Sequence, residues 1–256
     1  MTDSGLRGLR RFAVWLVLCT LPFYFLDLIL GSLSALTRAS LPAAALMAVV
    51  PAVAALAVTA RSGEWGALRH GLRLRRRPLL SWLVAVAAMP PIVIAASGGR
   101  GFENPGASLV VLSVVFLAGA AAEELGWTGF VLPRLRGVVG ELWAAVAIGT
   151  VWAAWHIVPY VQTGYTAMEI AGHCLFSVAF RVVLVRIATA ANDSVWPAVV
   201  GHAAYNIAWS LSPNSGLDYD PWIAAALTAG LAACLCLAEY ARAKPEKAPA
   251  NSAGED

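Results

Sequence analysis

The sequence predicts an all-α membrane protein with about eight transmembrane helices around a polar cavity. Hydrophobic residues make up 59% of the 256 residues and charged residues only 13%, and the mean hydropathy is +0.70. Soluble proteins average about 45–50% apolar and about 25% charged residues. We therefore expect a polytopic membrane protein in which a single transmembrane domain covers residues 12–240.

Eight apolar segments are long enough to cross the bilayer, since about 30 Å of hydrocarbon needs roughly 20 helical residues. In chain order they lie near residues 12–31, 41–60, 79–97, 107–130, 141–159, 168–190, 196–212 and 221–240. The pair Pro90-Pro91, and Pro159 placed after the fifth helix, predict kinks or helix ends. The sequence contains no internal repeat and no soluble domain.

The basic residues lie in alternate connections, which predicts the orientation of the helices. The N-terminal segment, the second, fourth and sixth connections and the tail hold nearly all of them, whereas the other connections hold only Arg38 and Arg100. Basic loops stay in the cytoplasm, so we expect a cytoplasmic N-terminus over residues 1–11 and a cytoplasmic tail over 241–256. The tail is polar and is predicted to be disordered. We expect an integral protein of the plasma (inner) membrane.

Two features bear on partners and cofactors. The run RLRRR in the connection 61–78 suits either nucleic acid or anionic lipid, and a basic loop beside a transmembrane helix favours lipid, so we expect membrane lipids and no nucleic acid as partners. The four cysteines all lie in apolar segments and lack CxxC spacing. They indicate neither a disulfide framework nor a zinc knuckle.

Ionisable and amide side chains within three predicted helices point to a functional site, because charged groups are costly in lipid. The fourth helix carries Glu123 and Glu124, the fifth ends with His156, and the seventh carries His202 and Asn206. The last two are four residues apart, so a helix places them on one face. The two glutamates lie about 100° apart around a helix. One of them is therefore expected to face the site, while the other bonds to neighbouring structure.

Other residues are expected to surround this site. Trp152 stands four residues before His156, which predicts an aromatic ring beside the imidazole, and Trp127 and Trp155 are expected to flank the site. The segment LAGAAA before the glutamates presents small side chains that let another helix approach closely. His173 in the sixth helix matches no motif and is expected to be structural.

A carboxylate, two imidazoles and an amide from three helices are the parts of a hydrolytic site. A glutamate can take a proton from water, and a histidine can share this task or hold a metal. A second histidine with an asparagine can donate hydrogen bonds to an oxyanion. Other intramembrane proteases fit less well: the sequence has no HExxH motif for a zinc centre and no GxSxG motif for a serine nucleophile. Its YD pair, in GLDYDP, lies in a connection.

The chain resembles the CAAX protease and bacteriocin-processing (CPBP, or Abi) family of intramembrane proteases in three motifs that occur in the same order. They are EELGW followed by GFVLPRL, then WAAWH, then HAAYN, on the fourth, fifth and seventh predicted helices. The family includes the eukaryotic CAAX prenyl endopeptidase and bacterial lysostaphin resistance protein A-like proteins. The resemblance covers roughly residues 107–212, and the joint order of the motifs makes it specific.

The resemblance implies a role for each matching residue. Glu123 stands at the first glutamate of the family's EExxxR motif and His156 at the histidine of its FxxxH motif, a pair thought to activate the attacking water. His202 and Asn206 stand at the HxxxN motif, which implies the oxyanion-stabilising pair. Glu124 stands at the second glutamate and is expected to support the site.

Two positions depart from the family pattern. Trp152 stands where the family often has Phe, and Thr128 stands where the EExxxR motif has its arginine. The missing cation removes a partner for Glu124, and Arg134 is near enough in sequence to take its place.

The cofactor stays open at this point. Glu123, His156 and His202 would suit zinc with an open position for water, and they would equally suit a metal-free base.

The sequence therefore predicts an intramembrane endopeptidase that cleaves membrane-associated peptides or proteins with water activated by Glu and His, in a cavity that faces the cytoplasm. Two other functions stay open. One is a proton-coupled transporter with an intramembrane Glu and His relay, against which the lack of a repeated half counts. The other is a non-catalytic immunity or scaffold member of the same family, which Thr128 favours. The identity of the substrate, prenylated or not, and the oligomeric state do not follow from the sequence.

Overall fold

The computed structural model describes residues 3–30, 43–104, 106, 108–216 and 218–243, and these residues form helices and no strand. The predicted all-α class is confirmed. Arg38 and residues 244–256, which make up most of the predicted tail, lie outside the described residues. α12 extends to Ala243, so the predicted tail begins inside a helix.

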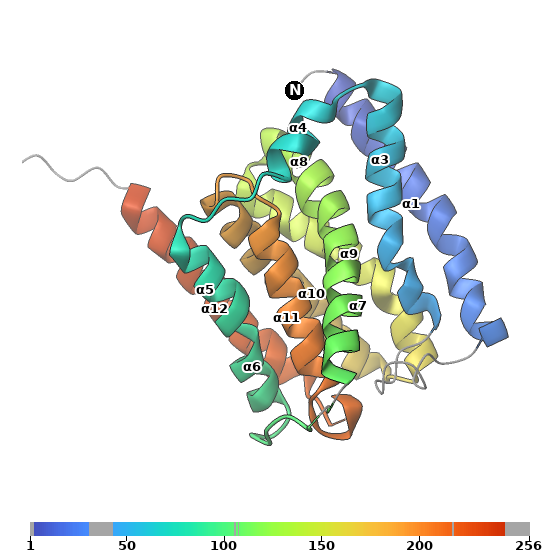
Figure 1. The fold of residues 1–256 in the computed structure, drawn as a ribbon, viewed down its shortest axis with the longest axis vertical. Coiled ribbons are helices and arrows are strands. Elements are labelled where there is room, and N and C mark those ends of the chain that lie inside the picture. Colours follow the sequence, from blue (N-terminus) through green and yellow to red (C-terminus); the bar gives the residue numbers. More distant parts are fainter. Residues whose placement is uncertain (1–2, 31–42, 105, 107, 217, 244–256) are drawn as a thin grey trace, which may run out of the picture.

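The chain forms a bundle of helices (Figure 1). The first half contains α1 (Asp3–Leu30), the 3₁₀ helix η1 (Ala43–Val49), α3 (Val50–Ser62), α4 (Trp65–Gly71), α5 (Leu79–Ala87) and α6 (Met89–Ala96). The second half contains α7 (Ser108–Gly126), the π-helical turn η2 (Trp127–Val131), α8 (Leu132–Val139), α9 (Glu141–Thr163), α10 (Ala167–Ala190), α11 (Trp196–Ser210), the 3₁₀ turn η3 (Pro213–Gly216) and α12 (Pro221–Ala243).

Within the described residues, seven helical segments are long and apolar enough to cross a membrane, which confirms seven of the eight predicted spans. They are Gly5–Leu26, Ala43–Ser62, Leu79–Ala96, Leu109–Val139, Glu141–Thr163, Ala167–Ala190 and Pro221–Arg242.

The remaining predicted segment, 196–212, is not among these seven because α11 has only 15 residues. That length gives about 22 Å of helix, short of the roughly 30 Å of hydrocarbon. The chain still crosses the bundle there, since the N–H of Val195, before α11, donates to the carbonyl of Gly71 and the carbonyl of Leu211, after α11, accepts from the N–H of Glu103 at the other end. α11 packs against α5, α6, α7 and α10, so this short helix lies inside the bundle.

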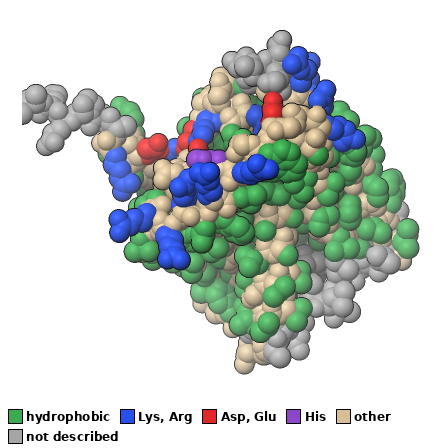
Figure 2. Space-filling view, turned by 45° about the horizontal axis from the view of Figure 1, so that its top comes forward, with side chains coloured by type: hydrophobic (Ala, Val, Ile, Leu, Met, Phe, Trp, Pro, Cys, Tyr) green, Lys and Arg blue, Asp and Glu red, His purple; other side chains and the backbone are tan. Residues whose placement is uncertain are grey.

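Exposed arginines gather at one end of the bundle. Figure 2 shows them as a group of basic side chains above a largely hydrophobic flank. We call this end the arginine-rich face. Its exposed residues come from the start of α1, the end of α3 and the segment 63–78: Arg7, Arg10, Arg11, Arg61, Arg69, Arg73, Arg76 and Arg77. The basic N-terminal segment and the basic second connection thus lie at the same end of the bundle, as predicted, and the cytoplasmic location of this face stays a prediction.

The opposite end is held together by contacts between its connections. Arg100 Nη1, after α6, lies 3.0 Å from Asp218 Oδ2, before α12. The indole N–H of Trp222, at the start of α12, donates to the carbonyl of Met168, at the start of α10, at 3.1 Å. The end of α6 and the starts of α10 and α12 thus lie together at the end remote from the arginine-rich face.

The helix break predicted from Pro90-Pro91 is confirmed. α5 ends at Ala87 and α6 begins at Met89, with both prolines in its first turn. A proline at this place lacks only a backbone N–H that a helix start leaves without an intrahelical partner.

Pro159 does not end α9, contrary to the prediction, because the helix continues to Thr163. A proline inside a helix removes the donor to the carbonyl four residues earlier, which here is that of Trp155. The hydroxyl of Tyr24, from α1, donates to this carbonyl at 2.7 Å. A neighbouring helix thus satisfies the freed backbone group, as transmembrane helices with internal prolines require.

The end of α7 packs tightly against α3. A Cβ atom on Gly126 would stand 2.5 Å from the Cβ of Pro51 and 2.6 Å from its carbonyl oxygen. Earlier in the predicted small-residue surface, a Cβ on Gly119 would stand 3.8 Å from Ala48. The close approach expected from the small residues is therefore confirmed, and its tightest point lies directly after the two glutamates.

Replacing Gly126 by alanine is expected to lower the melting temperature of the purified protein by several degrees. The added methyl group has no room beside Pro51, and overpacking of this kind costs about 1–3 kcal/mol. Gly137→Ala, in α8, is the matched control because its Cβ would meet nothing within 4 Å. Removing a helical glycine there should leave the melting temperature unchanged or raise it. Equal melting temperatures for the two variants would contradict this account of the α3–α7 contact.

Candidate active site

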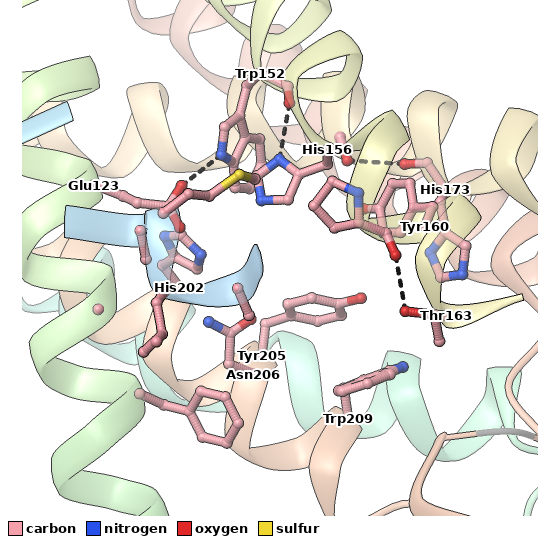
Figure 3. A pocket seen from close by; sticks show the side chains of 18 of the residues that line it. Glu123, Trp152, His156, Tyr160, Thr163, His173, His202, Tyr205, Asn206 and Trp209 are labelled. Atoms are coloured by element: carbon pink, nitrogen blue, oxygen red, sulfur yellow. Dashed lines mark hydrogen bonds between the residues drawn. The ribbon is translucent and has the colours of Figure 1, made fainter. Parts of the chain in front are cut away.

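Four of the five predicted site residues line one cavity of about 470 Å³. Glu123 reaches it from α7, His156 from α9, and His202 and Asn206 from α11. Figure 3 shows these four side chains around the same space. Glu124, the fifth predicted residue, is fully buried and lies outside the cavity wall.

Trp152 connects the two predicted bases. Its indole Nε1–H donates to Glu123 Oε2 at 2.6 Å, and its backbone carbonyl lies 2.8 Å from His156 Nδ1. The indole and imidazole centroids are 5.3 Å apart, which confirms the predicted pairing of the two rings. The bond to Glu123 was not predicted. One tryptophan therefore fixes the positions of both the carboxylate and the imidazole.

The partner of His156 decides its tautomer. A carbonyl oxygen can only accept, so Nδ1 carries the proton, and Nε2 of the neutral ring keeps a lone pair. Oε1 of Glu123 accepts no hydrogen bond from any described residue. The two bases thus each retain one atom with a free lone pair, in residues that both line the cavity.

The second imidazole, that of His202, is held in place by Glu124, which lies outside the cavity wall. Nδ1 of His202 lies 3.0 Å from Glu124 Oε1, and both side chains are buried. A carboxylate accepts, so Nδ1 donates and Nε2 remains available to the cavity. Asn206, one helical turn further along α11, has no hydrogen-bonded side-chain partner among the described residues. Its amide is therefore available to a bound molecule.

Glu124 is held by an ion pair that the sequence analysis missed. Arg181, from α10, places Nη1 2.7 Å from Glu124 Oε2, and Thr128 Oγ1 donates to the same oxygen at 2.5 Å. Arg181 is fully buried, and its guanidinium carbon lies 4.2 Å from the ring centroid of Trp152. A carboxylate buried this deeply requires a paired cation and further hydrogen bonds. Here Glu124 has both.

Arg134 does not take the place of the missing arginine of the EExxxR motif, contrary to our expectation. Its Nη2 lies 3.0 Å from Glu64 Oε2, and its Nη1 donates to the carbonyl of Phe130 at 2.9 Å. Arg181 supplies the cation instead. An arginine inside the apolar run of the sixth predicted helix was the signal that could have identified it.

A metal centre does not fit the arrangement. In the part of the chain that the structure describes, no three His, Cys, Asp or Glu side chains stand close enough together to hold a metal ion. We therefore derive no catalytic step through a metal, and the zinc ligands considered from the sequence stay a prediction.

Aromatic side chains form the other end of the cavity. His173, expected to be structural, lines it together with Tyr160, Tyr165 and Tyr205. The His173 ring stacks on Tyr160 with centroids 4.8 Å apart. Burial raises the pKa of Tyr165, in the connection between α9 and α10, to about 12, and the charge of nearby Glu169 raises it further. The phenol of Tyr165 therefore stays protonated at neutral pH and keeps its donor.

Two of the tryptophans expected to flank the site lie outside the cavity wall. Trp127 and Trp155 are buried and pack edge to face, with centroids 6.0 Å apart. The indole N–H of Trp155 donates to Thr20 Oγ1 at 2.8 Å. Both tryptophans therefore support the site from behind, and of the three tryptophans expected at the site Trp152 lines the cavity.

Removing Arg181 alone is expected to destabilise the protein strongly. Arg181→Met removes the guanidinium partner of the buried Glu124 carboxylate, and breaking a buried ion pair in this way costs about 3–5 kcal/mol. The double variant Arg181→Met, Glu124→Gln removes both charges and should recover part of this loss. Denaturant unfolding of the two purified variants in detergent measures the difference. A double variant no more stable than Arg181→Met would show that the ion pair does not govern stability here.

One comparison with known proteins found a similar family. The model of the family described as type II CAAX prenyl endopeptidase Rce1-like matches residues 105–208. The comparison with curated proteins found no match. The matched segment contains Glu123, His156, His202 and Asn206, and also the buried pair to Glu124. Residues 105–208 of this chain are therefore similar to the family of type II CAAX prenyl endopeptidases described as Rce1-like.

Proposed function

We propose that this protein is an intramembrane endopeptidase of the CAAX protease type, which hydrolyses a peptide bond in a membrane-associated peptide or protein. The observation that carries the proposal is the convergence of Glu123, His156, His202 and Asn206 on one cavity. The family match over the same segment supports it.

Glu123 and His156 are the bases that activate water. Each has one atom with a free lone pair, Oε1 and Nε2, and Trp152 holds both side chains in place. A water held between them loses a proton to the base as its oxygen bonds to the scissile carbonyl carbon. The same proton then passes to the leaving amine as the C–N bond breaks. General-base catalysis of this kind contributes about 10²–10⁴-fold in rate.

His202 and Asn206 stabilise the oxyanion of the tetrahedral intermediate. The Asn206 amide is a donor in any state, whereas His202 donates through Nε2 only as an imidazolium, because Nδ1 already donates to Glu124. The charges then balance: the imidazolium and Arg181 are positive, and Glu123 and Glu124 are negative. A neutral set of paired charges is what a site inside the membrane favours.

The rest of the cavity favours an extended, largely apolar substrate segment. η1 contributes Ala45–Val49 and α7 contributes Val115 and Phe116 to its wall. A peptide carbonyl inside an α-helix is already hydrogen bonded, so the segment must be unwound for its carbonyl to meet His202 and Asn206. This requirement selects a chain segment that is extended or near the end of a helix.

We also propose that the protein lies in the plasma (inner) membrane with its arginine-rich face in the cytoplasm. The exposed arginines of this face are the support, because basic loops are retained in the cytoplasm and contact anionic lipid there. Both termini would then be cytoplasmic.

Single substitutions of the two bases are expected to abolish most cleavage of a fluorogenic peptide library by the purified protein. Glu123→Gln and His156→Gln should each lower the rate about 10²–10⁴-fold, and Asn206→Ala about 10²–10³-fold.

Glu103→Gln and His70→Gln are the matched controls. They make the same chemical changes outside the cavity, His70 in α4 and Glu103 in the connection after α6, and should keep wild-type rates. Ion-coupled uptake without cleavage by the wild type would favour a transporter. Absence of both activities with preserved partner binding would favour a scaffold. Either result would overturn the proposal.

Trp152→Phe is expected to lower kcat about ten- to hundredfold with little change in KM. The phenyl ring keeps the contact with Arg181 and the backbone keeps the bond to His156, so the variant removes only the hydrogen bond to Glu123. A hydrogen bond to a charged group is worth about 1.5–3 kcal/mol. Steady-state kinetics separates the two constants, and a raised KM with unchanged kcat would contradict a positioning role for Trp152.

A further inference from the structure

The cavity lies in the half of the bundle that is remote from the arginine-rich face. α9 begins at the arginine-rich end and contributes only residues 152–163 of its 23-residue length. α10 runs the other way and contributes residues 173–177, near its start, and α11 contributes residues 202–209, near its end. In each of α9, α10 and α11, the residues that line the cavity therefore lie in the part of the helix that is farther from the arginine-rich face.

The reactive groups form the deep end of the cavity. His156 lies seven residues before Thr163 on α9, about 10 Å along the helix axis, and Thr163 and Tyr165 both line the cavity at the α9–α10 connection. Both of these residues are partly exposed. The cavity thus extends from the catalytic groups to a connection at the end opposite the arginine-rich face.

A close-packed layer separates the cavity from the arginine-rich face. Glu124 and Arg181 form its polar part, and Phe130, Ile148 and Leu184 are among the most completely buried apolar side chains. Thr128 links this layer to a second, much smaller pocket of about 100 Å³, which is lined by residues of the arginine-rich end and shares no lining residue with the main cavity. Among the described residues, this layer therefore lies between the two pockets.

The charges of the two ends differ in sign. The connections at the end opposite the arginine-rich face carry, among the described residues, one arginine, Arg100, against Glu103, Asp218 and Asp220. The rule that basic loops are retained in the cytoplasm then assigns this end to the outer side of the membrane.

We propose that the cavity opens toward the extracytoplasmic side and receives a polypeptide segment that is exported or anchored in the outer leaflet. The expectation of a cavity that faces the cytoplasm is therefore not what the geometry supports. The substrate class rests on the proposed function, whereas the sidedness of the cavity does not.

Cysteine labelling tests the sidedness without any need for catalysis. In a variant that lacks Cys19, Cys174, Cys234 and Cys236, single cysteines are placed at three positions: Thr163→Cys at the cavity mouth, Gly101→Cys at the opposite end and Gly137→Cys beside the arginines. A Cβ at either glycine meets nothing within 4 Å. A membrane-impermeant maleimide is added to intact spheroplasts and, separately, to inside-out vesicles.

The cysteines at 163 and 101 are expected to react in intact spheroplasts, and the cysteine at 137 only in inside-out vesicles. If the cysteine at 163 reacted only in inside-out vesicles, as the cysteine at 137 is expected to do, the proposal would be overturned. So would its failure to react from either side while it reacts in denatured protein. Melting temperatures of the three variants confirm that each one folds.

A catalytically disabled Glu123→Gln version of the same variants separates the two proposals. It should give the same labelling pattern, because the pattern depends only on access. Soluble peptide added to intact spheroplasts should then be cleaved by the protein with Glu123 and not by the Glu123→Gln version. Labelling of position 163 in intact spheroplasts without any such cleavage would support the proposed sidedness of the cavity. It would contradict both the substrate class and the proposed peptidase function.

Discussion

The buried carboxylate of Glu124 is the constraint on which the site depends. It lies inside the bundle with no exposure, and Arg181, Thr128 and His202 all bond to it. Charge in the membrane interior is tolerated when it is paired and hydrogen bonded. These bonds join α7, α10 and α11 at one level of the bundle, and they fix the direction in which the His202 ring presents its second nitrogen. The short helix α11 is thus held by a polar contact as well as by packing.

The two adjacent glutamates, Glu123 and Glu124, have different roles because neighbouring side chains on a helix point in different directions. Glu123 faces the cavity and receives the indole N–H of Trp152, whereas Glu124 faces the helices behind it. The first keeps an oxygen available for water, and the second is saturated by partners. The proposed chemistry follows from this division, since a saturated carboxylate orients a histidine and an unsaturated one accepts a proton.

Much of this arrangement could be predicted from local patterns, and the rest depends on contacts between distant segments. Composition predicted the all-α membrane class, and the spacing in HAAYN predicted that its histidine and asparagine share a face. Arg181 was missed because its partner Glu124 is 57 residues away, and the two meet through the packing of both α7 and α10 on α11. The end predicted at Pro159 was wrong because Tyr24, from another helix, bonds to the freed carbonyl. The segment predicted at 196–212 forms α11, whose 15 residues are too few for it to count among the spanning helices.

The most direct test of the account is an experimental structure of the Glu123→Gln variant with an uncleaved peptide bound. The account predicts an extended segment in the cavity, with one carbonyl oxygen about 2.7–3.2 Å from both His202 Nε2 and the Asn206 amide. The same carbonyl carbon should face His156 and residue 123. A peptide bound elsewhere, or one whose carbonyl points away from α11, would contradict the claim that these four residues form a single hydrolytic site.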